Sequence, residues 1–495
     1  MTELIADELR RIAKGEIFDD EWSRKIYSVD ASHYTLLPLV VVHPMDKYDI
    51  QEICKYSFAK NFPITARGAG TGLLGQSLSN CVVIDFTKNI NRIMEIEEDY
   101  VVVEPGTVKG VLDRELRIRG KFLPPDPASS NYCTIGGMIA NNSSGPHALG
   151  YGSTIDFLEA VSVVYADGSC GYLSEKSSCE ERTINLLKLL SPYVNVIQNG
   201  YPQVKKNSCG YRLDAVLSDS GFRPHKVFAG SEGTLGLVTS AKFKILDLPI
   251  YRSMLVLAFE DLISATVVLP NILSFLPAAV EMLDHSAISS QKNATGRPAG
   301  CLLFVEFAND DLRDVERRQC QCKDEIAPNC ASIETANDQS SIDRIYAARK
   351  GALNNIMKMT VGSRRPIGLI EDTVVKTSFL SDYVLYLQTM YLENGLDYVM
   401  YGHLGDGNLH TRPIIDINSP SELQLIESIA DEVFSKVIKN GGTITGEHGD
   451  GLARVGYIPR VYGQAIFSIF RQVKQLFDPA YLMNPGKKIP LERPK

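Results

Sequence analysis

The chain has 495 residues, of which 44% are hydrophobic and 22% are charged, and its formal net charge at neutral pH is −8. This length is enough for about two to four domains with sizeable cores, and this composition excludes an intrinsically disordered chain. The acidic balance argues against a nucleic-acid partner, which would favour a basic face.

The sequence predicts neither a signal peptide nor a membrane-spanning segment. Met1–Gly15 is charged and amphipathic, without the apolar core of a signal peptide. No apolar run reaches the length of about 18 residues that a transmembrane helix requires. The cluster formed by Cys320, Cys322 and Cys330 lies in a charged segment and is interpreted as free thiols rather than a metal site. We therefore expect a cytoplasmic protein and leave peripheral attachment to the inner face of a membrane open.

The first half of the chain begins with a polar, helical arm over residues 1–34. From Val40 onward, short apolar runs are separated by glycine and proline, which is typical of strands in an α+β region. This region is expected to end near Pro249. The predicted helices are Asp49–Lys60 and Val108–Arg119, and the predicted strands are Val40–Val42, Val82–Phe86, Tyr100–Val103, Val161–Val164, Lys226–Ala229 and Leu237–Ile245.

After Ser253 strands alternate with long helices. The predicted strands are Met254–Phe259, Cys301–Phe307, Ala331–Thr335 and Tyr398–Leu404. The predicted helices are Leu262–Phe275, Asp311–Ala327, Ser341–Met359 and Leu380–Glu393, followed by Leu423–Asn440 and Gln464–Phe477. This order indicates an open antiparallel sheet with helices on one face.

Four glycine-rich segments interrupt the first half of the chain. Pro63–Gly75 combines closely spaced glycines with a threonine and Arg67, which can form an anion-binding turn. It matches neither the P-loop nor the dinucleotide fingerprint, and a tight connection without a ligand is an equal alternative. The other segments are Thr134–Asn142, Gly145–Gly152 and Gly230–Gly236. Together they suit a long ligand with a pyrophosphate and a flat ring.

A hairpin is predicted near the C-terminal end. The turn signal Gly405–Asn408 separates two extended runs. Closing the hairpin around it places Leu404 opposite Leu409 and His403 opposite His410, with Cβ atoms about 5 Å apart. Two imidazoles in this arrangement can bind one divalent metal.

A second block, Gly446–Gly451, supplies the remaining candidate groups. Glu447 can complete a His₂Glu set with an open coordination position, and His448 can move a proton beside it. The alternative is an ordinary histidine pair without a metal. The density of glycine around both blocks favours close approach of the backbone to a ligand.

These motifs together resemble the FAD-linked oxidases and dehydrogenases of the vanillyl-alcohol-oxidase type. The chain looks most similar to the branch of D-lactate, glycolate and D-2-hydroxyglutarate dehydrogenases. The matching segments are Pro63–Gly75, Pro125–Asn142, Gly230–Gly236, His403–His410, Gly446–Gly451 and Phe477–Gly486.

The resemblance implies a domain organisation. An N-terminal helical arm (1–34) precedes a two-subdomain FAD-binding domain of the p-cresol methylhydroxylase (PCMH) type (35–249). An α+β cap domain for the substrate (250–440) carries the open antiparallel sheet, and a C-terminal helical segment (441–495) returns to the flavin.

The resemblance also implies the FAD contacts. The first loop would hold the pyrophosphate, the second and third would line the flavin, and Glu232 with Gly233 would lie on the adenine side. Except for His147, these loops show no histidine or cysteine typical of covalent attachment, so FAD is expected to be non-covalent. The implied contacts are Arg67, Gly68, Ala69, Gly70, Thr71, Gly72, Gln76, Pro125, Asp126, Thr134, Gly136, Gly137, Asn141, Gly152, Glu232, Gly233 and Asn484.

The implied reaction is oxidation of a D-2-hydroxy acid to the 2-oxo acid, with hydride transfer to flavin N5. His403, His410 and Glu447 would bind a divalent metal (Zn, Mn or Fe), and His448 would be the base. Arg349 would bind a substrate carboxylate, with Arg364 and Arg365 as further candidates.

One departure bears on the electron acceptor. Asp450 stands where the family often has isoleucine, a variant typical of longer relatives that carry iron–sulfur clusters. This sequence has no closely spaced cysteine run for such a cluster. We therefore expect a separate acceptor: an iron–sulfur protein, an electron-transfer flavoprotein, a cytochrome or a quinone. A homodimer is left open.

Three alternatives remain at this stage. One is an FAD-containing transferase of the alkyl-glycerone-phosphate synthase type. Another is a flavin subunit, catalytic or silent, of a larger iron–sulfur complex. The third, a flavin-free metal hydrolase, would not need the glycine-rich loops.

Overall fold

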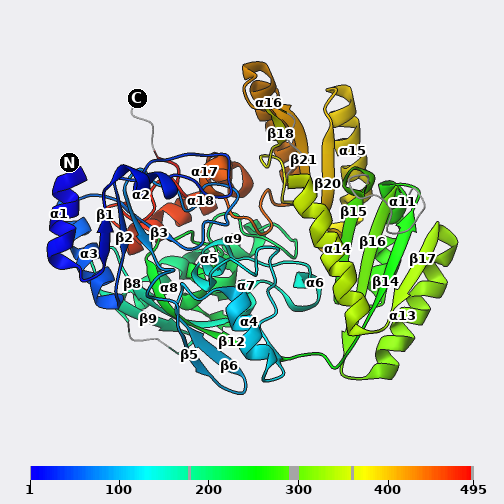
Figure 1. The fold of residues 1–495 in the computed structure, drawn as a ribbon, viewed down its shortest axis with the longest axis horizontal. Coiled ribbons are helices and arrows are strands. Elements are labelled where there is room, and N and C mark those ends of the chain that lie inside the picture. The colour runs from blue at the N-terminus through cyan, green and yellow to red at the C-terminus, as the bar shows by residue number, and fades with distance from the viewer. Residues whose placement is uncertain (1, 177–179, 289–299, 358–361, 492–495) are drawn as a thin grey trace.

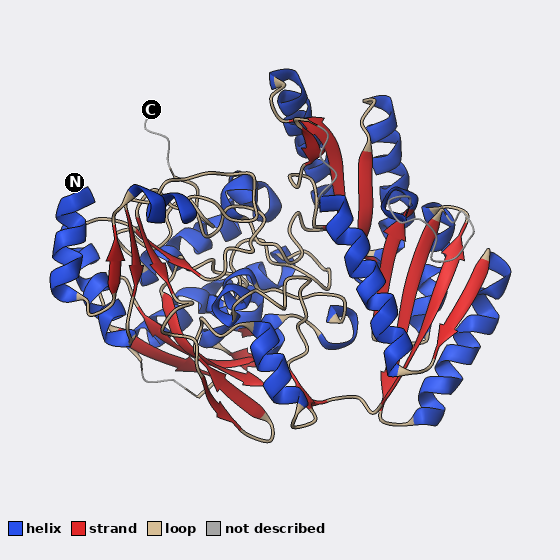
Figure 2. Cartoon of the chain, viewed as in Figure 1, coloured by secondary structure: helices blue, strands red, loops and turns tan. Residues whose placement is uncertain are grey.

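The structure is a computed structural model that describes residues 2–176, 180–288, 300–357 and 362–491. Two bodies of mixed helix and sheet lie side by side, as Figures 1 and 2 show. The N-terminal half and the last two helices form the first body, and the middle of the chain forms the second. The prediction of an α+β fold is confirmed. Within the described residues, no helix is both long enough and apolar enough to span a membrane.

The first body contains a four-stranded sheet. Its order is β1 (Glu16–Phe18), β2 (Val40–His43), β4 (Val82–Asp85) and β3 (Ile64–Arg67), with β2, β4 and β3 parallel. Helices α1 (Thr2–Ile12) and α3 (Lys47–Lys60) pack on it through Leu9 and Ile53, while α2 (Glu21–Ile26) buries no residue. The expected N-terminal arm therefore also contributes an edge strand, because β1 pairs with β2.

A five-stranded antiparallel sheet completes this body. Its order is β5 (Ile93–Ile96), β6 (Tyr100–Val103), β12 (Leu237–Lys244), β8 (Leu158–Val164) and β9 (Cys170–Ser174). The associated helices include α4 (Lys109–Arg117), α5 (Ile135–Asn141) and α8 (Glu181–Leu190). The strand predicted at Lys226–Ala229 is wrong, because Pro224–Phe228 forms a 3₁₀ helix. The proline presets a helical φ, and the apolar run reflects burial rather than a strand.

The second body is built on the antiparallel sheet that the sequence predicted. Its order is β17 (Ser332–Ala336), β14 (Tyr251–Phe259), β16 (Cys301–Asn309), β15 (Ala279–Asp284), β20 (Tyr398–His403), β21 (Asn408–Asp416) and β18 (Arg364–Pro366), and β19 (Thr373–Val374) pairs with β21. Strand β15 was not predicted. It lies at the centre of the sheet and carries Glu281, whose side chain is fully buried.

Helices cover both faces of this sheet, so the prediction of one covered face is wrong. Leu255 and Leu257 pack into the core that includes α11 (Leu262–Ser274), α13 (Leu312–Ile326) and α15 (Leu380–Glu393). Met254 and Val256 point the other way and pack with Ile342 of α14 (Gln339–Met357). The last two residues of the helix predicted at Ser341–Met359 lie outside the described residues.

The C-terminal segment returns to the first body. After α16 (Pro420–Lys439) the chain crosses back and forms α17 (Gly451–Arg454), drawn in orange in Figure 1, and α18 (Ile458–Phe477), drawn in red. The backbone N–H of Asn484 then donates to the carbonyl of Ile64 (2.8 Å). Residues 441–450 therefore form a strap between the two bodies.

The remaining elements are short. They are α6 (Ala148–Tyr151), α7 (Thr154–Phe157), α9 (Val194–Gly200), α10 (Leu213–Val216), α12 (His285–Ile288), β7 (Lys121–Phe122), β10 (Leu217–Ser218), β11 (Gly221–Phe222), β13 (Leu246–Asp247), and the 3₁₀ turns Ser191–Tyr193, Ala327–Asn329, Thr377–Phe379, Leu404–Asp406 and Val455–Tyr457.

Candidate functional site

The hairpin of β20 and β21 brings two histidines together, but not in the predicted register. His403 pairs with Asn408, and Tyr401 pairs with His410. The register differs because Leu404 enters a 3₁₀ turn that closes at Gly407 in the left-handed region (φ 68°). A shift of two residues leaves every side chain on its original face. The two imidazoles therefore remain neighbours, with ring centroids 5.3 Å apart.

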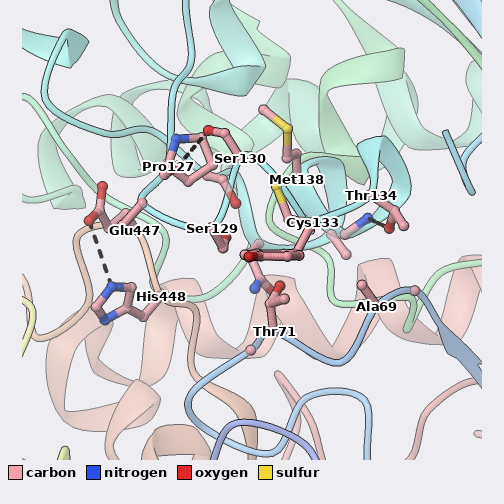
Figure 3. Close-up of a pocket in the computed structure, with 18 of the residues that line it drawn as sticks. Ala69, Thr71, Pro127, Ser129, Ser130, Cys133, Thr134, Met138, Glu447 and His448 are labelled. Atoms are coloured by element: carbon pink, nitrogen blue, oxygen red, sulfur yellow. Dashed lines mark hydrogen bonds and ion pairs between the residues drawn. The ribbon is translucent and has the colours of Figure 1, made fainter. Parts of the chain in front are cut away.

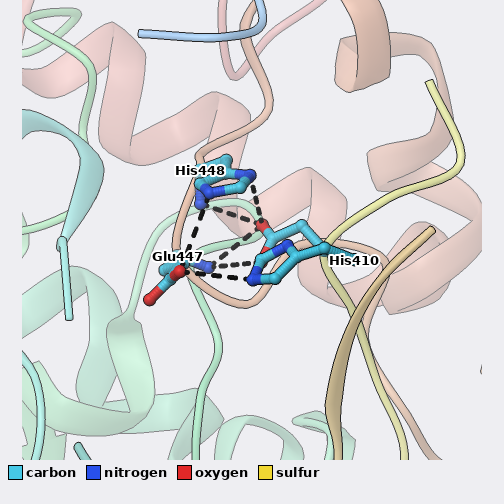
Figure 4. A group of neighbouring side chains, drawn as sticks. His410, Glu447 and His448 are labelled. Carbon is cyan, nitrogen blue, oxygen red and sulfur yellow. Dashed lines mark hydrogen bonds and ion pairs between the residues drawn. The ribbon is translucent and has the colours of Figure 1, made fainter. Parts of the chain in front are cut away.

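Glu447, on the strap between the bodies, reaches both histidines. Its Oε1 atom lies 3.1 Å from Nε2 of His403 and 3.5 Å from Nε2 of His410. Nε2 of His448 is 3.7 Å from the same oxygen, and Figure 4 shows this oxygen facing His410 and His448. The sequence motifs thus converge in space. Two imidazole nitrogens and one carboxylate oxygen suit a divalent cation such as Zn, Mn or Fe.

His403 is oriented from behind by a buried carboxylate. Its Nδ1 atom lies 2.7 Å from Oε1 of Glu281, and Arg349 forms an ion pair with the same carboxylate. Burial alone would raise the pKa of Glu281, but Arg349 and His403 outweigh it and lower the pKa to about 2. An ionised partner on Nδ1 leaves Nε2 free to act as a ligand.

The loop that carries Glu447 and His448 is held by Asp372. Its carboxylate accepts hydrogen bonds from the backbone N–H groups of Gly446 (3.0 Å), Glu447 (3.0 Å) and His448 (2.8 Å). Asp372 itself has a φ of 66°, a conformation that few non-glycine residues adopt. One of its oxygens belongs to a group of possible ligand atoms, all within 4.8 Å of one another, that also includes atoms of His410, Glu447 and His448. Since its oxygens already accept three N–H groups, we interpret Asp372 as the anchor of the loop.

The two ring nitrogens of His448 face different carboxylates, Glu371 at Nδ1 and Glu447 at Nε2. Nδ1 lies 3.1 Å from Oε1 of Glu371, which also pairs with Arg412 at 2.5 Å. Burial alone would lower the pKa of His448, but Asp372 and Glu371 raise it above the usual value of a histidine. With Nδ1 engaged, Nε2 faces the side of Glu447 where the three imidazoles meet.

These groups stand at one end of a cavity of about 920 Å³. Figure 3 shows the glycine-rich loops, marked by Ala69 and Thr71, opposite the segment from Ser129 to Thr134. Glu447 and His448 close the end of the cavity in the same view. The predicted FAD contacts that line it are Arg67, Gly68, Ala69, Gly70, Thr71, Gly72, Gln76, Asp126, Thr134, Gly136, Gly137, Asn141, Glu232 and Gly233.

The cavity has the size and the backbone lining that a dinucleotide needs. A Cβ atom on Gly68 would lie 2.2 Å from Oγ1 of Thr134, and one on Gly72 would lie 2.7 Å from Oε1 of Gln76. The loops therefore leave no room for side chains at these positions. Gln76 also donates to the backbone carbonyl of His448, which joins this wall to the loop that carries Glu447 and His448.

Four predicted site residues lie outside the lining of the cavity. They are Pro125, Gly152, Asn484 and Arg365. The side chain of Asn484 braces two loops instead, donating to the carbonyls of Gln76 (2.9 Å) and Glu232 (2.7 Å). Arg365 lies on β18, which is an edge strand of the sheet.

Two other predicted contacts reach the cavity but have protein partners. The guanidinium of Arg67 donates to the carbonyls of Tyr27 (3.1 Å) and Val29 (2.7 Å). The carboxylate of Glu232 pairs with Lys488 at 3.1 Å. Both side chains therefore brace the wall of the cavity from behind.

Sequence reasoning missed several groups in the wall. Arg412 lies two residues after His410 on β21, so the period of a strand could have revealed it.

The Nε atoms of Arg412 and of Arg349, which the sequence did predict, are buried and have no hydrogen-bond partner among the described residues. Cys133 also lines the cavity, although the sequence analysis noted only His147 in these loops.

Comparisons with known proteins agree with this arrangement. Residues 38–172 match the family model "FAD binding domain", and residues 248–488 match "FAD linked oxidases, C-terminal domain". D-2-hydroxyglutarate dehydrogenase of Escherichia coli (strain K12) is 32% identical over 508 residues, covering 95% of this chain and 50% of that protein. The chain spans about half the length of the hydroxyglutarate dehydrogenases that it matches.

Two further similarities concern proteins of comparable length. Glycolate oxidase subunit GlcD of Bacillus subtilis (strain 168) is 29% identical over 503 residues, covering 98% of this chain and 97% of that protein. The solved structure of 4-ethylphenol oxidase from Gulosibacter chungangensis has a TM-score of 0.72 at 14% identity, covering 98% of this chain and 97% of that chain. The latter similarity concerns the fold alone.

Proposed function

Because the chain belongs to the family of FAD-linked oxidases, we propose that it is a dehydrogenase that oxidises a D-2-hydroxy acid to the 2-oxo acid. D-2-hydroxyglutarate is the first candidate substrate, followed by glycolate and D-lactate. The observation that carries the proposal is the convergence of His403, His410, Glu447 and His448 at one end of the glycine-lined cavity.

The site divides into a cofactor wall and a metal end. Backbone around Gly68–Gly72 and Gly136–Gly137 would hold a non-covalent FAD. Nε2 of His403, Nε2 of His410 and Oε1 of Glu447 would hold a divalent metal. When bound, the metal supplies Lewis acidity at the substrate hydroxyl, and FAD supplies the hydride acceptor.

His448 is the proposed base. Its Nδ1 atom is engaged by Glu371 at 3.1 Å, so the lone pair for proton transfer is on Nε2. Nε2 faces the side of Glu447 on which the substrate hydroxyl would lie. An imidazole near neutral pH suits this proton transfer.

Two arginines favour a substrate with a second carboxylate. Arg349 and Arg412 line the cavity, and each is more than nine-tenths buried. Glu281 and Glu371 each engage one guanidinium, but both Nε–H groups are left without a partner among the described residues. A buried donor without a partner is costly, so a substrate carboxylate would be stabilised there. Four similar proteins are named D-2-hydroxyglutarate dehydrogenase, which agrees with a dicarboxylate.

We also propose that the electrons pass from FAD to a separate acceptor, such as an iron–sulfur protein, an electron-transfer flavoprotein, a cytochrome or a quinone. The similar protein of Bacillus subtilis is named as a subunit, which supports a role within a larger redox assembly.

Anaerobic flavin reduction tests the proposal. The purified flavoprotein is mixed with a panel of D- and L-2-hydroxy acids, and the loss of flavin absorbance is recorded. We expect only D-acids or glycolate to reduce the flavin, with D-2-hydroxyglutarate fastest. If no 2-hydroxy acid reduces the flavin, the proposal is contradicted and the FAD-containing transferase becomes the favoured alternative.

A further inference from the structure

A buried lysine that the proposed reaction does not use lies beside the metal end of the cavity. Lys206 follows α9 in the FAD-binding body and is 1% exposed. Its Nζ atom donates to the carbonyl of Gly145 (3.1 Å) and to Oε2 of Glu447 (3.1 Å). The carboxylate of Asp406 lies 3.8 Å away. The lysine therefore reaches across from one body to a proposed metal ligand on the strap.

The two oxygens of Glu447 have different partners. Oε2 accepts hydrogen bonds from Lys206 and from Oγ of Ser144 (2.7 Å), both in the FAD-binding body. Oε1 faces the imidazoles of His403 and His410. Figure 4 shows one oxygen directed toward the rings and the other pointing away. The carboxylate is thus held so that a single oxygen faces the proposed cation.

This orientation matters for substrate binding. A carboxylate with both oxygens free can bind a divalent cation through both and occupy one more coordination position. A 2-hydroxy acid needs two adjacent positions, one for its hydroxyl and one for its carboxylate. A ligand restricted to one oxygen preserves those positions.

We propose that Lys206 is a positioning residue that, together with Ser144, restricts Glu447 to one metal-binding oxygen and so keeps two coordination positions open for the substrate. The inference rests on the proposed metal site. A second consequence follows from charge, because an ammonium group close to a divalent cation repels it. Lys206 therefore weakens metal binding while it favours chelation of the substrate.

A purely structural ion pair predicts the opposite sign for metal binding. If Lys206 only neutralised Glu447, its removal would leave a buried carboxylate without a partner and disturb the fold around it. Metal affinity and flavin content would then fall together. The proposal instead expects metal affinity to rise while flavin content stays constant.

Cobalt provides the test, because the visible spectrum of bound Co²⁺ reports its coordination number. The metal-stripped flavoprotein is titrated with Co²⁺ and then with oxalate, which chelates through two oxygens as a 2-hydroxy acid would. The flavin spectrum of the metal-free protein is subtracted. We compare the wild type with Lys206→Met, with the charge-preserving Lys206→Arg, and with Ser144→Ala.

We expect Lys206→Met to bind Co²⁺ at least tenfold more tightly and oxalate at least tenfold more weakly, with a spectrum of altered coordination. Lys206→Arg should resemble the wild type. Ser144→Ala keeps the charge, so it should change Co²⁺ affinity less than threefold and still weaken oxalate severalfold. If Lys206→Met does not fold, Ser144→Ala decides the question alone.

Two results would overturn the inference separately from the proposed function. Weaker or unchanged Co²⁺ binding by Lys206→Met, or unchanged oxalate binding by Ser144→Ala, would refute the positioning role and leave the metal site intact. Glu447→Ala, which lacks a proposed ligand, is the control that should bind no Co²⁺. If the wild type also binds no Co²⁺, the metal site and this inference are both refuted.

Discussion

The two ends of the cavity are built by different means. The FAD-binding wall is mainly backbone, with glycines that leave no space for a side chain, as at Gly68 and Gly72. The other end, where we propose a metal, is made of side chains, and its charged groups are almost fully buried, as Glu281, Glu371 and Arg412 illustrate. A cofactor that always stays in one pose can be held by fixed backbone. Charge that develops on a substrate during the reaction is stabilised by ionisable groups placed beside it.

The two ends should therefore respond differently to substitution. A change in the backbone-lined wall should weaken flavin binding and leave the chemistry of the remaining holoprotein intact. A change at the metal end should leave the flavin bound and reduce the reaction. The variants at His403, His448 and Gly68 separate these two outcomes.

The largest effect is expected for His403→Ala. The variant loses one of the proposed metal ligands, so metal content and flavin reduction by substrate should fall together, by roughly 10³-fold or more in rate. Metal analysis and anaerobic stopped-flow measurements check both quantities. His285→Ala, which removes an exposed histidine of the same body, is the matched control and should change neither. Full activity in a His403→Ala protein that binds no metal would refute the metal role.

His448→Ala should separate the base from the metal. Metal and flavin content should remain at wild-type levels, while flavin reduction slows by roughly 10²–10⁴-fold because the proton acceptor is missing. The flavin spectrum and the rate of its reduction are the measurements. Normal reduction in this variant would mean that the base lies elsewhere.

Arg349→Lys should change substrate preference. Lysine keeps the charge beside Glu281 but loses the planar fork that binds a carboxylate. We expect kcat/KM for D-2-hydroxyglutarate to fall by roughly 10–100-fold, and that for glycolate to fall much less. Arg364→Lys is the control, because Arg364 pairs with Glu422 and does not line the cavity. Equal losses for both acids would argue against a subsite for a second carboxylate.

Gly68→Ala tests the opposite end. The added methyl group would displace Thr134, which caps α5, and a lost cap costs about 1 kcal/mol. We expect FAD to bind roughly 5–10-fold more weakly by titration of the apoprotein, a factor that corresponds to this energy. The FAD that remains bound should react at the normal rate. Gly456→Ala, where a Cβ atom meets nothing within 4 Å, should be silent in both assays.

The smallest effect on the reaction is expected at His147, where the two bodies contact each other and stability is the quantity that changes. Its imidazole lies between Asp126 (2.6 Å) and Glu306 (3.1 Å). Burial alone would lower the pKa of His147, but these two carboxylates raise it well above the usual value of about 6.5. A raised pKa in the folded state means that the stabilisation is complete below about pH 6.5 and is lost as the pH rises through the folded-state value.

His147→Gln should therefore cost about 1–3 kcal/mol of unfolding free energy at pH 6. The difference from the wild type should shrink as the pH is raised from 6 through the folded-state pKa of His147. Thermal unfolding of both proteins across this range is the measurement. A difference that grows with pH would contradict the assigned charge state.

The sequence predicts the two ends of the cavity unequally, for physical reasons. Glycine loops are local features, so Gly68–Gly72 and Gly136–Gly137 could be recognised from neighbouring residues alone. The proximity of His403 and His410 could also be predicted, because they share one hairpin. The turn at Leu404–Asp406 changed only the register. Glu447 could be predicted as a third ligand from the glycine-rich block around it, but its distance from the hairpin could not be derived, since the strap that carries it comes from another part of the chain.

The groups behind the site could not be predicted in this way. Glu281 lies on β15 among apolar residues, so nothing in the sequence indicated that its carboxylate contacts the site. Lys206 comes from the other body, far from the site in the sequence. A lone carboxylate in an otherwise apolar strand is a usable signal, because burying a charge is costly unless it is paired. The partner of such a charge, here Arg349 or His403, becomes visible only when the chain is folded.

The central claim is that a metal and a flavin, held by neighbouring parts of one cavity, act on the same D-2-hydroxy acid. Anaerobic flavin reduction by D- and L-2-hydroxyglutarate tests it most directly, with the protein as isolated, after chelation, and after the metal is restored. We predict reduction by the D-acid alone, its loss on chelation without loss of FAD, and its return with the metal. Equal reduction before and after complete removal of the metal would contradict the account.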